Sequence, residues 1–167
     1  YKNYLFSGVG LNNTSVSVII GANVTRIPKY LLCPSYENKA YISRINCVIF
    51  EEGSQCKTIG ERAFEGLSGL KELVIPSSVT KIGGTESLSK GILQGCTSLE
   101  SITIPFVGSS KSATGYQSVF GYLFGYDCED SSSAISGATY QISDYKAANS
   151  NTYKYVHNIS NYLANIT

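Results

Sequence analysis

The sequence lacks the features that mark several common classes of protein. Charged residues make up only 15% of the chain and the formal net charge is +1, so there is no basic footprint for a nucleic acid. No apolar run approaches the roughly 18 residues that a membrane-spanning helix needs. The chain begins YKNYLF, without Met or a signal peptide, and we expect it to be a mature or trimmed part of a longer protein.

Motifs for catalysis and metal binding are missing as well. The five cysteines form no C-x-x-C pair, and the one histidine, His157, is far from most of them, whereas a zinc site needs about four converging ligands. Asp127, Glu129 and Asp130 lack the spacing of an EF-hand calcium loop. There is no G-x-S-x-G motif, phosphate-binding loop or convergent acid pair. We therefore expect no enzyme activity, no metal and no cofactor.

Gly, Ser, Asn, Thr and Tyr are abundant instead, which suits an extracellular β-rich protein. At 167 residues the default is one domain with a sizeable core.

The dominant feature is an internal repeat between Ile59 and Pro105. One set of residues recurs with the same internal spacing 29 positions later. The first set is Phe64, Leu70, Leu73, Ile75 and Pro76, and the second is Leu93, Leu99, Ile102, Ile104 and Pro105. A fixed period of this size is typical of a solenoid, whose turns bury their apolar faces against one another.

The repeat extends towards the N-terminus. Short β-branched segments predict adjacent strands at 18–20, 48–50, 73–75 and 102–104. A second signature, V-T-R-I or a variant of it, starts at Val24, Cys56 and Val79, with both apolar ends directed inward. Helix-like pieces with a core pair then follow at Pro28–Leu32, Glu61–Phe64 and Gly91–Leu93.

The pattern breaks after Pro105. We expect a long excursion over Asp130–Asn151 and a strand that includes Tyr153, Tyr155 and Val156. Leu163 and Ile166 reproduce an interval of the repeat, so a further repeat strand is predicted there.

The segment IGERAFEGLSGLKELVIPSSV at 59–79 resembles the BspA-like leucine-rich repeat, also called the Treponema-type repeat, and GILQGCTSLESITIP at 91–105 resembles its second half. The resemblance implies a right-handed, β-rich α/β solenoid, a stack of short strands with short helical or 3-10 turns. We take residues 1–167 as a single domain, with clear repeats at 16–105 and an irregular turn at 106–167 that contains insertions. The resemblance also implies a secreted or cell-surface bacterial protein.

The concave strand face is the usual contact surface of a solenoid. Its outward positions include Ile19, Ile49, Val74 and Thr103 in one row, and Glu72 and Ser101 in the other. The apolar row fits either plain β-propensity, the favoured interpretation, or a shallow binding strip.

An aromatic segment is the second candidate for binding. Tyr116, Tyr122 and Tyr126 are possible interface anchors. The favoured alternative is that Phe120 with Leu123 or Phe124 forms the core pair of a fourth turn.

The cysteines predict free thiols. Cys56 and Cys96 occupy positions that hold Val or Leu in other turns, so we expect both to be buried. Cys47 is outward and is the thiol we expect to react. No two cysteines share an equivalent position, which predicts five free thiols, although the loop after Cys33 leaves a Cys33–Cys47 bridge open.

The functional hypothesis is a non-enzymatic adhesion module that binds a protein, such as a host matrix protein or another microbial surface protein. The alternative is an accessory repeat region that supports an enzyme or a wall-anchoring domain elsewhere in the parent chain. Nucleic-acid binding and membrane insertion are not expected.

Overall fold

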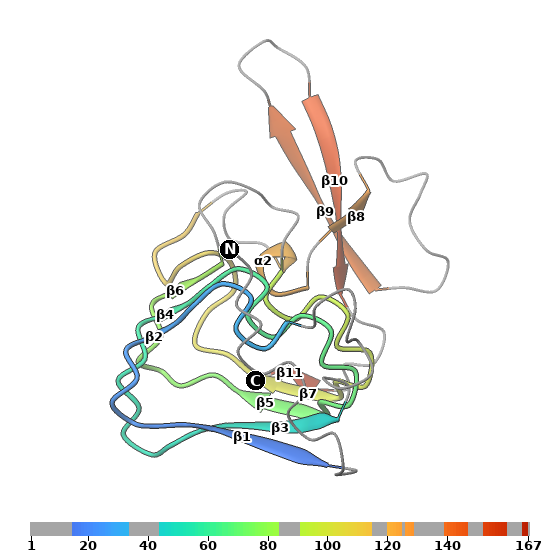
Figure 1. Ribbon diagram of the computed structural model, residues 1–167. Helices are drawn as coiled ribbons and strands as arrows, with labels where there is room; N and C mark the ends of the chain where they lie inside the picture. The colour runs from blue at the N-terminus through green and yellow to red at the C-terminus, as the bar shows by residue number, and fades with distance from the viewer. Residues whose placement is uncertain are drawn as a thin grey trace.

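The computed structural model describes residues 15–33, 44–83, 91–114, 120–124, 126–128, 139–146, 152–159 and 165–166, the last four of these ranges by their backbone. A sheet of five parallel strands in the order β1-β3-β5-β7-β11 forms one side of the molecule (Figure 1). Its strands are β1 (Val16–Ile20), β3 (Ile45–Phe50), β5 (Glu72–Val74), β7 (Ser101–Thr103) and β11 (Asn165–Ile166).

The register of this sheet confirms the predicted repeat. Val48 pairs with Val18 on one side and with Leu73 on the other, and Leu73 pairs with Ile102. Strands β5 and β7 start and end one residue earlier than predicted. The further repeat strand is confirmed too, because Ile166 pairs with Ile102.

The second signature forms a smaller parallel sheet, which the sequence did not predict as such. Its strands are β2 (Arg26–Ile27), β4 (Thr58–Ile59) and β6 (Lys81–Ile82), and the three isoleucines pair in register and are buried. The prediction that both apolar ends point inward is wrong for Val24, which is 37% exposed. Val24 belongs to the first repeat in the described ranges. Within those ranges a neighbouring repeat packs against it on one side, which leaves its side chain partly exposed.

The pieces expected to be helical are turns. In each of them a backbone N–H donates to a carbonyl of the following repeat, so these groups are not available for a helix of their own. The pairs are Leu32 with Ala63 (2.8 Å), Phe64 with Ile92 (3.0 Å) and Leu93 with Leu123 (2.7 Å). Tyr30 (φ 60°) and Arg62 (φ 54°) also have left-handed backbone, which a right-handed helix excludes.

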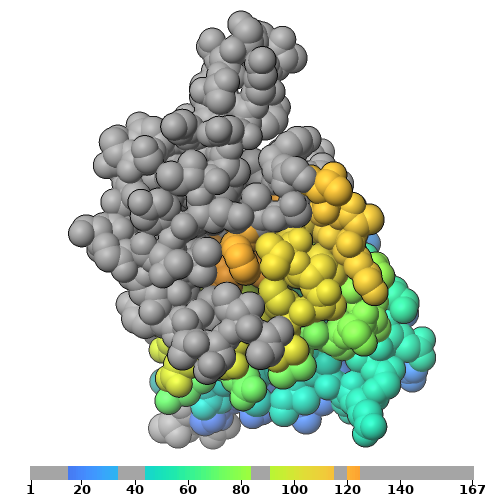
Figure 2. Space-filling view, turned by 180° about the vertical axis from the view of Figure 1, so that it is seen from behind, coloured from blue at the N-terminus to red at the C-terminus, as the bar shows by residue number. Residues whose placement is uncertain are grey.

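The core lies between the two parallel sheets and is built from equivalent residues of successive repeats. Figure 2 shows these repeats as bands that follow the order of the sequence. The backbones approach closely at Gly66 and Gly95, where a Cβ on Gly95 would lie 3.5 Å from the Gly66 Cα. Both glycines have positive φ (75° and 78°), a conformation that glycine adopts without steric cost.

The chain after Pro105 continues the stack in two places. Ser110 forms an antiparallel bridge with Lys81, which adds a fourth rung to the smaller sheet. Helix α2 (Gly121–Phe124) places Leu123 and Phe124 in the core, with exposed fractions of 0% and 7%. The predicted pair of Phe120 with Leu123 or Phe124 is therefore confirmed only in part. Leu123 and Phe124 are the buried residues, whereas Phe120 is partly buried and packs against the core. No helix in the described ranges is long and apolar enough to cross a membrane.

A third, antiparallel sheet projects from the stack (Figure 1). It has the order β8-β10-β9, with β8 (Tyr126–Cys128), β9 (Thr139–Lys146) and β10 (Thr152–Ile159). The strand predicted near Tyr153 is confirmed, and His157 lies in it. The excursion predicted over 130–151 contains β9, a strand that was not predicted from the sequence. Tyr140 and Ile142 alternate there with polar residues, which is a strand pattern.

We predict that Phe64→Ala and Leu93→Ala each lower the free energy of unfolding by about 2–5 kcal/mol, as is typical of large-to-small core changes. The side chains are 0% and 2% exposed and lie in equivalent core positions of consecutive turns. Urea denaturation measures the effect, with Ile49→Ala on the exposed face as the control. A midpoint that neither core substitution moves would contradict this packing.

Candidate functional site

The outward face of the five-stranded sheet carries a row of apolar side chains. Strand alternation buries Val48 and Leu73 and turns their neighbours to the outside. Ile19, Ile49 and Val74 are 63%, 46% and 50% exposed, and no other large hydrophobic residue in the described ranges is as exposed as these. The register pairs Ile19 with Ile49, and Val74 with the partly buried Thr103. These four residues form what we call the apolar row.

A polar row runs beside the apolar row. The register pairs Ser17 with Cys47, and Glu72 with Ser101. Ser17 and Glu72 are exposed, whereas Cys47 and Ser101 are partly buried. The predicted residues of the strand face are therefore brought together in two adjacent rows.

A groove of about 470 Å³ opens on this face between β3 and β5. The ladder between these strands consists of one registered pair, Val48 with Leu73, whereas β5 and β7 share three pairs. The interval from Val48 to Leu73 is 25 residues, against 29 from Leu73 to Ile102. The shorter repeat therefore has fewer paired residues between its strands. The groove is lined by Asn46, Cys47, Val48, Ile49, Lys71, Glu72 and Val74.

The rim of the groove is polar and well solvated. The Lys71 Nζ lies 3.9 Å from an Oε1 of Glu100, and these side chains are 72% and 63% exposed. An exposed pair of this kind adds little stability. Its charges remain available to a partner at the rim of an apolar patch.

Sequence reasoning missed two lining residues, Asn46 and Lys71. Each stands directly before the outward residue of its strand signature, Cys47 or Glu72. Their equivalent positions, one residue before an outward residue, could have indicated that they lie beside the polar row.

The structure corrects the aromatic candidate Tyr122. Its side chain is only 9% exposed, and its Cδ1 would be 3.3 Å from a Cβ built on Gly83. It is buried because it belongs to the fourth turn of the stack, which leaves little of it for a partner. Tyr116 and the side chain of Tyr126 lie outside the described residues.

Four cysteines are described with their side chains, and all four are free thiols. Cys56 and Cys96 are buried, as predicted. The Cys33 Sγ donates to Oε2 of Glu65 (3.0 Å) and is not bonded to Cys47, which closes the alternative left open above. The side chain of Cys128 lies outside the described residues.

Buried Cys96 has a strongly perturbed thiol. Its Sγ donates to the carbonyl of Phe64 (3.2 Å), and burial raises its pKa to about 12. Burial also raises the pKa of Cys56. Such thiols are protonated at neutral pH and are poor nucleophiles and metal ligands. The part of the chain that the structure describes contains no group of three His, Cys, Asp or Glu residues placed to hold a metal ion.

Two stacked parallel sheets with equivalent core residues in each turn define a leucine-rich-repeat type of protein. The model of the BspA type leucine rich repeat region, with six copies, matches residues 35–160, about three quarters of the chain. The protein belongs to this family. The matched range extends beyond the repeats that are clear by eye at 16–105 and includes the third sheet. No curated protein and no solved structure matches the chain.

We predict five free thiols in the denatured, unreduced protein. The four described cysteines are unbridged, and the position of Cys128 in the repeat matches none of theirs. A colorimetric thiol assay in denaturant gives the count. One or three free groups would mean that a disulfide exists.

We further predict that stability falls in alkaline solution because of Cys96. An unfolded Cys has a pKa of about 8.5, whereas the folded value for Cys96 is about 12. Between these values the unfolded chain loses a proton that the folded chain keeps, so the free energy of unfolding drops by up to about 1.4 kcal/mol per pH unit.

Denaturation midpoints from about pH 8 to 11 measure this slope. Cys96→Ala should make it shallower than in the wild type, while Cys47→Ala, at the partly exposed thiol, should not. Equal slopes in all three proteins would contradict the assignment.

Proposed function

We propose that the protein is a non-enzymatic binding module of a secreted or cell-surface bacterial protein, and that it binds a protein partner through the outward face of the five-stranded sheet. Repeats of this family commonly act in protein interactions and are typical of bacterial surface proteins. We also propose that the stack is a right-handed solenoid. The parallel connections within each sheet support this hand, since such crossovers are right-handed in nearly all proteins.

The observation that carries the proposal is the apolar row itself. Three β-branched side chains, each 46–63% exposed, lie on neighbouring strands beside a groove of about 470 Å³. Lys71 and Glu72 line this groove, and Glu100 pairs with Lys71. An apolar centre with a polar rim is the usual anatomy of a protein interface. The hydrogen-bonded strands below hold these side chains in fixed positions, which limits the entropy lost on binding.

A panel of purified extracellular matrix proteins, screened by surface plasmon resonance, tests the proposal. We expect at least one of them to bind the wild-type protein. Val74→Glu and Ile49→Glu should each weaken this binding more than about tenfold, since loss of an interface anchor costs upwards of about 1.4 kcal/mol.

Val24→Glu is the matched control for Val74→Glu. Val24 is the same residue type and is 37% exposed, but it lies in the turn between β1 and β2. It should leave the affinity unchanged. The proposal fails if no panel member binds, or if Val74→Glu binds as tightly as Val24→Glu.

A further inference from the structure

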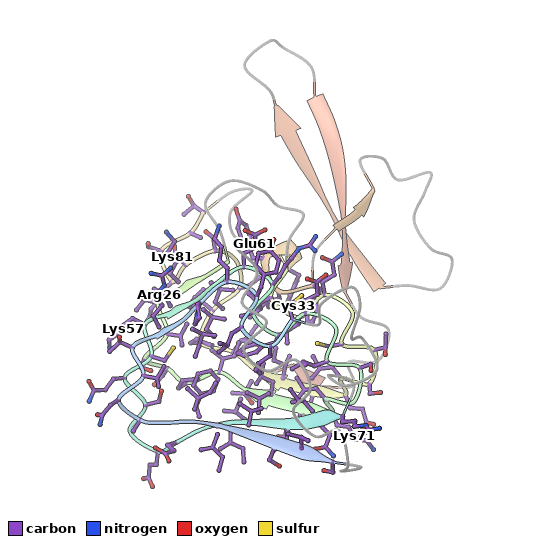
Figure 3. All side chains as sticks on the ribbon, viewed as in Figure 1. Arg26, Cys33, Lys57, Glu61, Lys71 and Lys81 are labelled. Atoms are coloured by element: carbon purple, nitrogen blue, oxygen red, sulfur yellow. The ribbon has the colours of Figure 1, made fainter. Side chains whose placement is uncertain are left out.

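The smaller sheet presents a second surface, with cations and no acid at its exposed positions. Each of its four described rungs offers one basic residue and one hydroxyl residue side by side in the sequence. The rungs are Thr25-Arg26, Lys57-Thr58, Thr80-Lys81 and Ser110-Lys111. We call the four cations of these rungs the basic ladder. Figure 3 shows Arg26, Lys57 and Lys81 at one side of the molecule, well away from Lys71.

Backbone pairing turns this pattern into a checkerboard. Arg26 pairs with Thr58, and Thr58 pairs with Lys81. In the adjoining row, the N–H of Lys57 donates to the carbonyl of Thr25 (2.8 Å), and the N–H of Lys111 donates to that of Thr80 (3.1 Å). In these pairs each cation faces a hydroxyl residue across the ladder. The N–H of Lys81 also donates to the carbonyl of Lys57 (3.2 Å), so these two cations are diagonal neighbours on adjacent rungs.

This arrangement keeps the positive charges available. Opposite charges placed across neighbouring strands would stabilise the sheet, and like charges would destabilise it. Hydroxyls avoid the repulsion without neutralising the cations. None of the four residues of the basic ladder makes an ion pair within the described ranges. Folding alone does not require hydroxyl residues opposite the cations. Their presence leaves the N–H donors of the cations free to bind an anion.

A groove of about 300 Å³ lies over the same rungs. Arg26, Thr58 and Lys81 line it, together with Lys29. The Lys29 Nζ is paired with Oε2 of Glu61 (3.2 Å), so the unneutralised charges of the groove are those of Arg26 and Lys81. An arginine, a lysine and a hydroxyl around one small hollow form a donor set that suits a carboxylate.

We propose that the basic ladder binds an extended acidic segment of a protein partner, independently of the apolar row. Successive rungs are about 4.8 Å apart, so consecutive cations are separated by one rung along the stack and by one row across it. Alternate side chains of an extended peptide are about 7 Å apart and lie on one side of it. Flexible Lys and Arg side chains cover that difference, so a segment with an acid at every second position can place carboxylates on consecutive cations.

The probe is a fluorescent synthetic peptide that alternates glutamate and threonine, measured by anisotropy at about 0.15 M ionic strength. We expect it to bind the wild-type protein and to dissociate as salt is added. The same peptide with glutamine in place of glutamate should not bind. Heparin oligosaccharide serves as a second polyanion.

Charge reversal identifies the surface. The double variant Lys57→Glu/Lys81→Glu should weaken binding of the acidic peptide at least about tenfold, because like charges then meet at two rungs. Lys57→Arg/Lys81→Arg should bind as the wild type does. Lys71→Glu is the matched control, since Lys71 is 72% exposed but lies directly before β5 of the other sheet. Val74→Glu should also leave binding of the peptide unchanged, which separates this result from the test of the apolar row.

Three outcomes would overturn the proposal. The acidic peptide could fail to bind the wild-type protein. It could bind the double charge-reversal variant as tightly as the Lys71→Glu variant. Heparin could bind in a Lys57- and Lys81-dependent way while the peptide does not, which would assign the surface to a glycan. All substituted side chains are exposed, and a thermal melt of each variant checks that it folds.

Discussion

Hydrogen bonds between neighbouring repeats are the interaction on which the rest of the structure depends. Each short strand and each turn gives its N–H groups to the repeat beside it, as Leu32 does to Ala63 and Phe64 to Ile92. A buried amide without a partner would cost more than most single packing contacts contribute. The repeats therefore hold one register, and this register lines up the core, the apolar row and the basic ladder.

The same constraint explains which predictions succeeded. The spacing of apolar residues is sufficient to locate strands, because alternation in a strand decides which side chains face the core. Val48 between Val18 and Leu73, and Ile166 beside Ile102, were therefore found from intervals alone. The helix-like pieces were misjudged because a pair such as Ala63-Phe64 fills the core equally well from a turn. Only the destination of the backbone hydrogen bonds distinguishes a turn from a helix there.

The candidate surfaces were less accessible to prediction from sequence. The outward positions of the apolar row followed from strand alternation. The groove, however, lies where a single registered pair joins β3 to β5, and the number of pairs between two strands cannot be read from the sequence. Tyr122 looked like an exposed anchor until the fourth turn placed it inside. The basic ladder needs the register of four rungs, including the antiparallel bridge of Ser110 to Lys81, before its cations form a pattern.

The return of β11 to the sheet shows how the fold tolerates change in length. From the second residue of the core pair to the next strand centre, the chain takes 9 residues between Phe64 and Leu73, and 9 between Leu93 and Ile102. From Phe124 to Ile166 it takes 42, a difference of 33 residues, yet Ile166 pairs with Ile102 as the register requires. The antiparallel sheet of β8, β9 and β10 thus behaves as a cassette inserted within a single repeat. Since closing a longer loop adds only a slowly growing entropy cost, cassettes of other lengths and shapes should fit the same point while the neighbouring repeats keep their pairing.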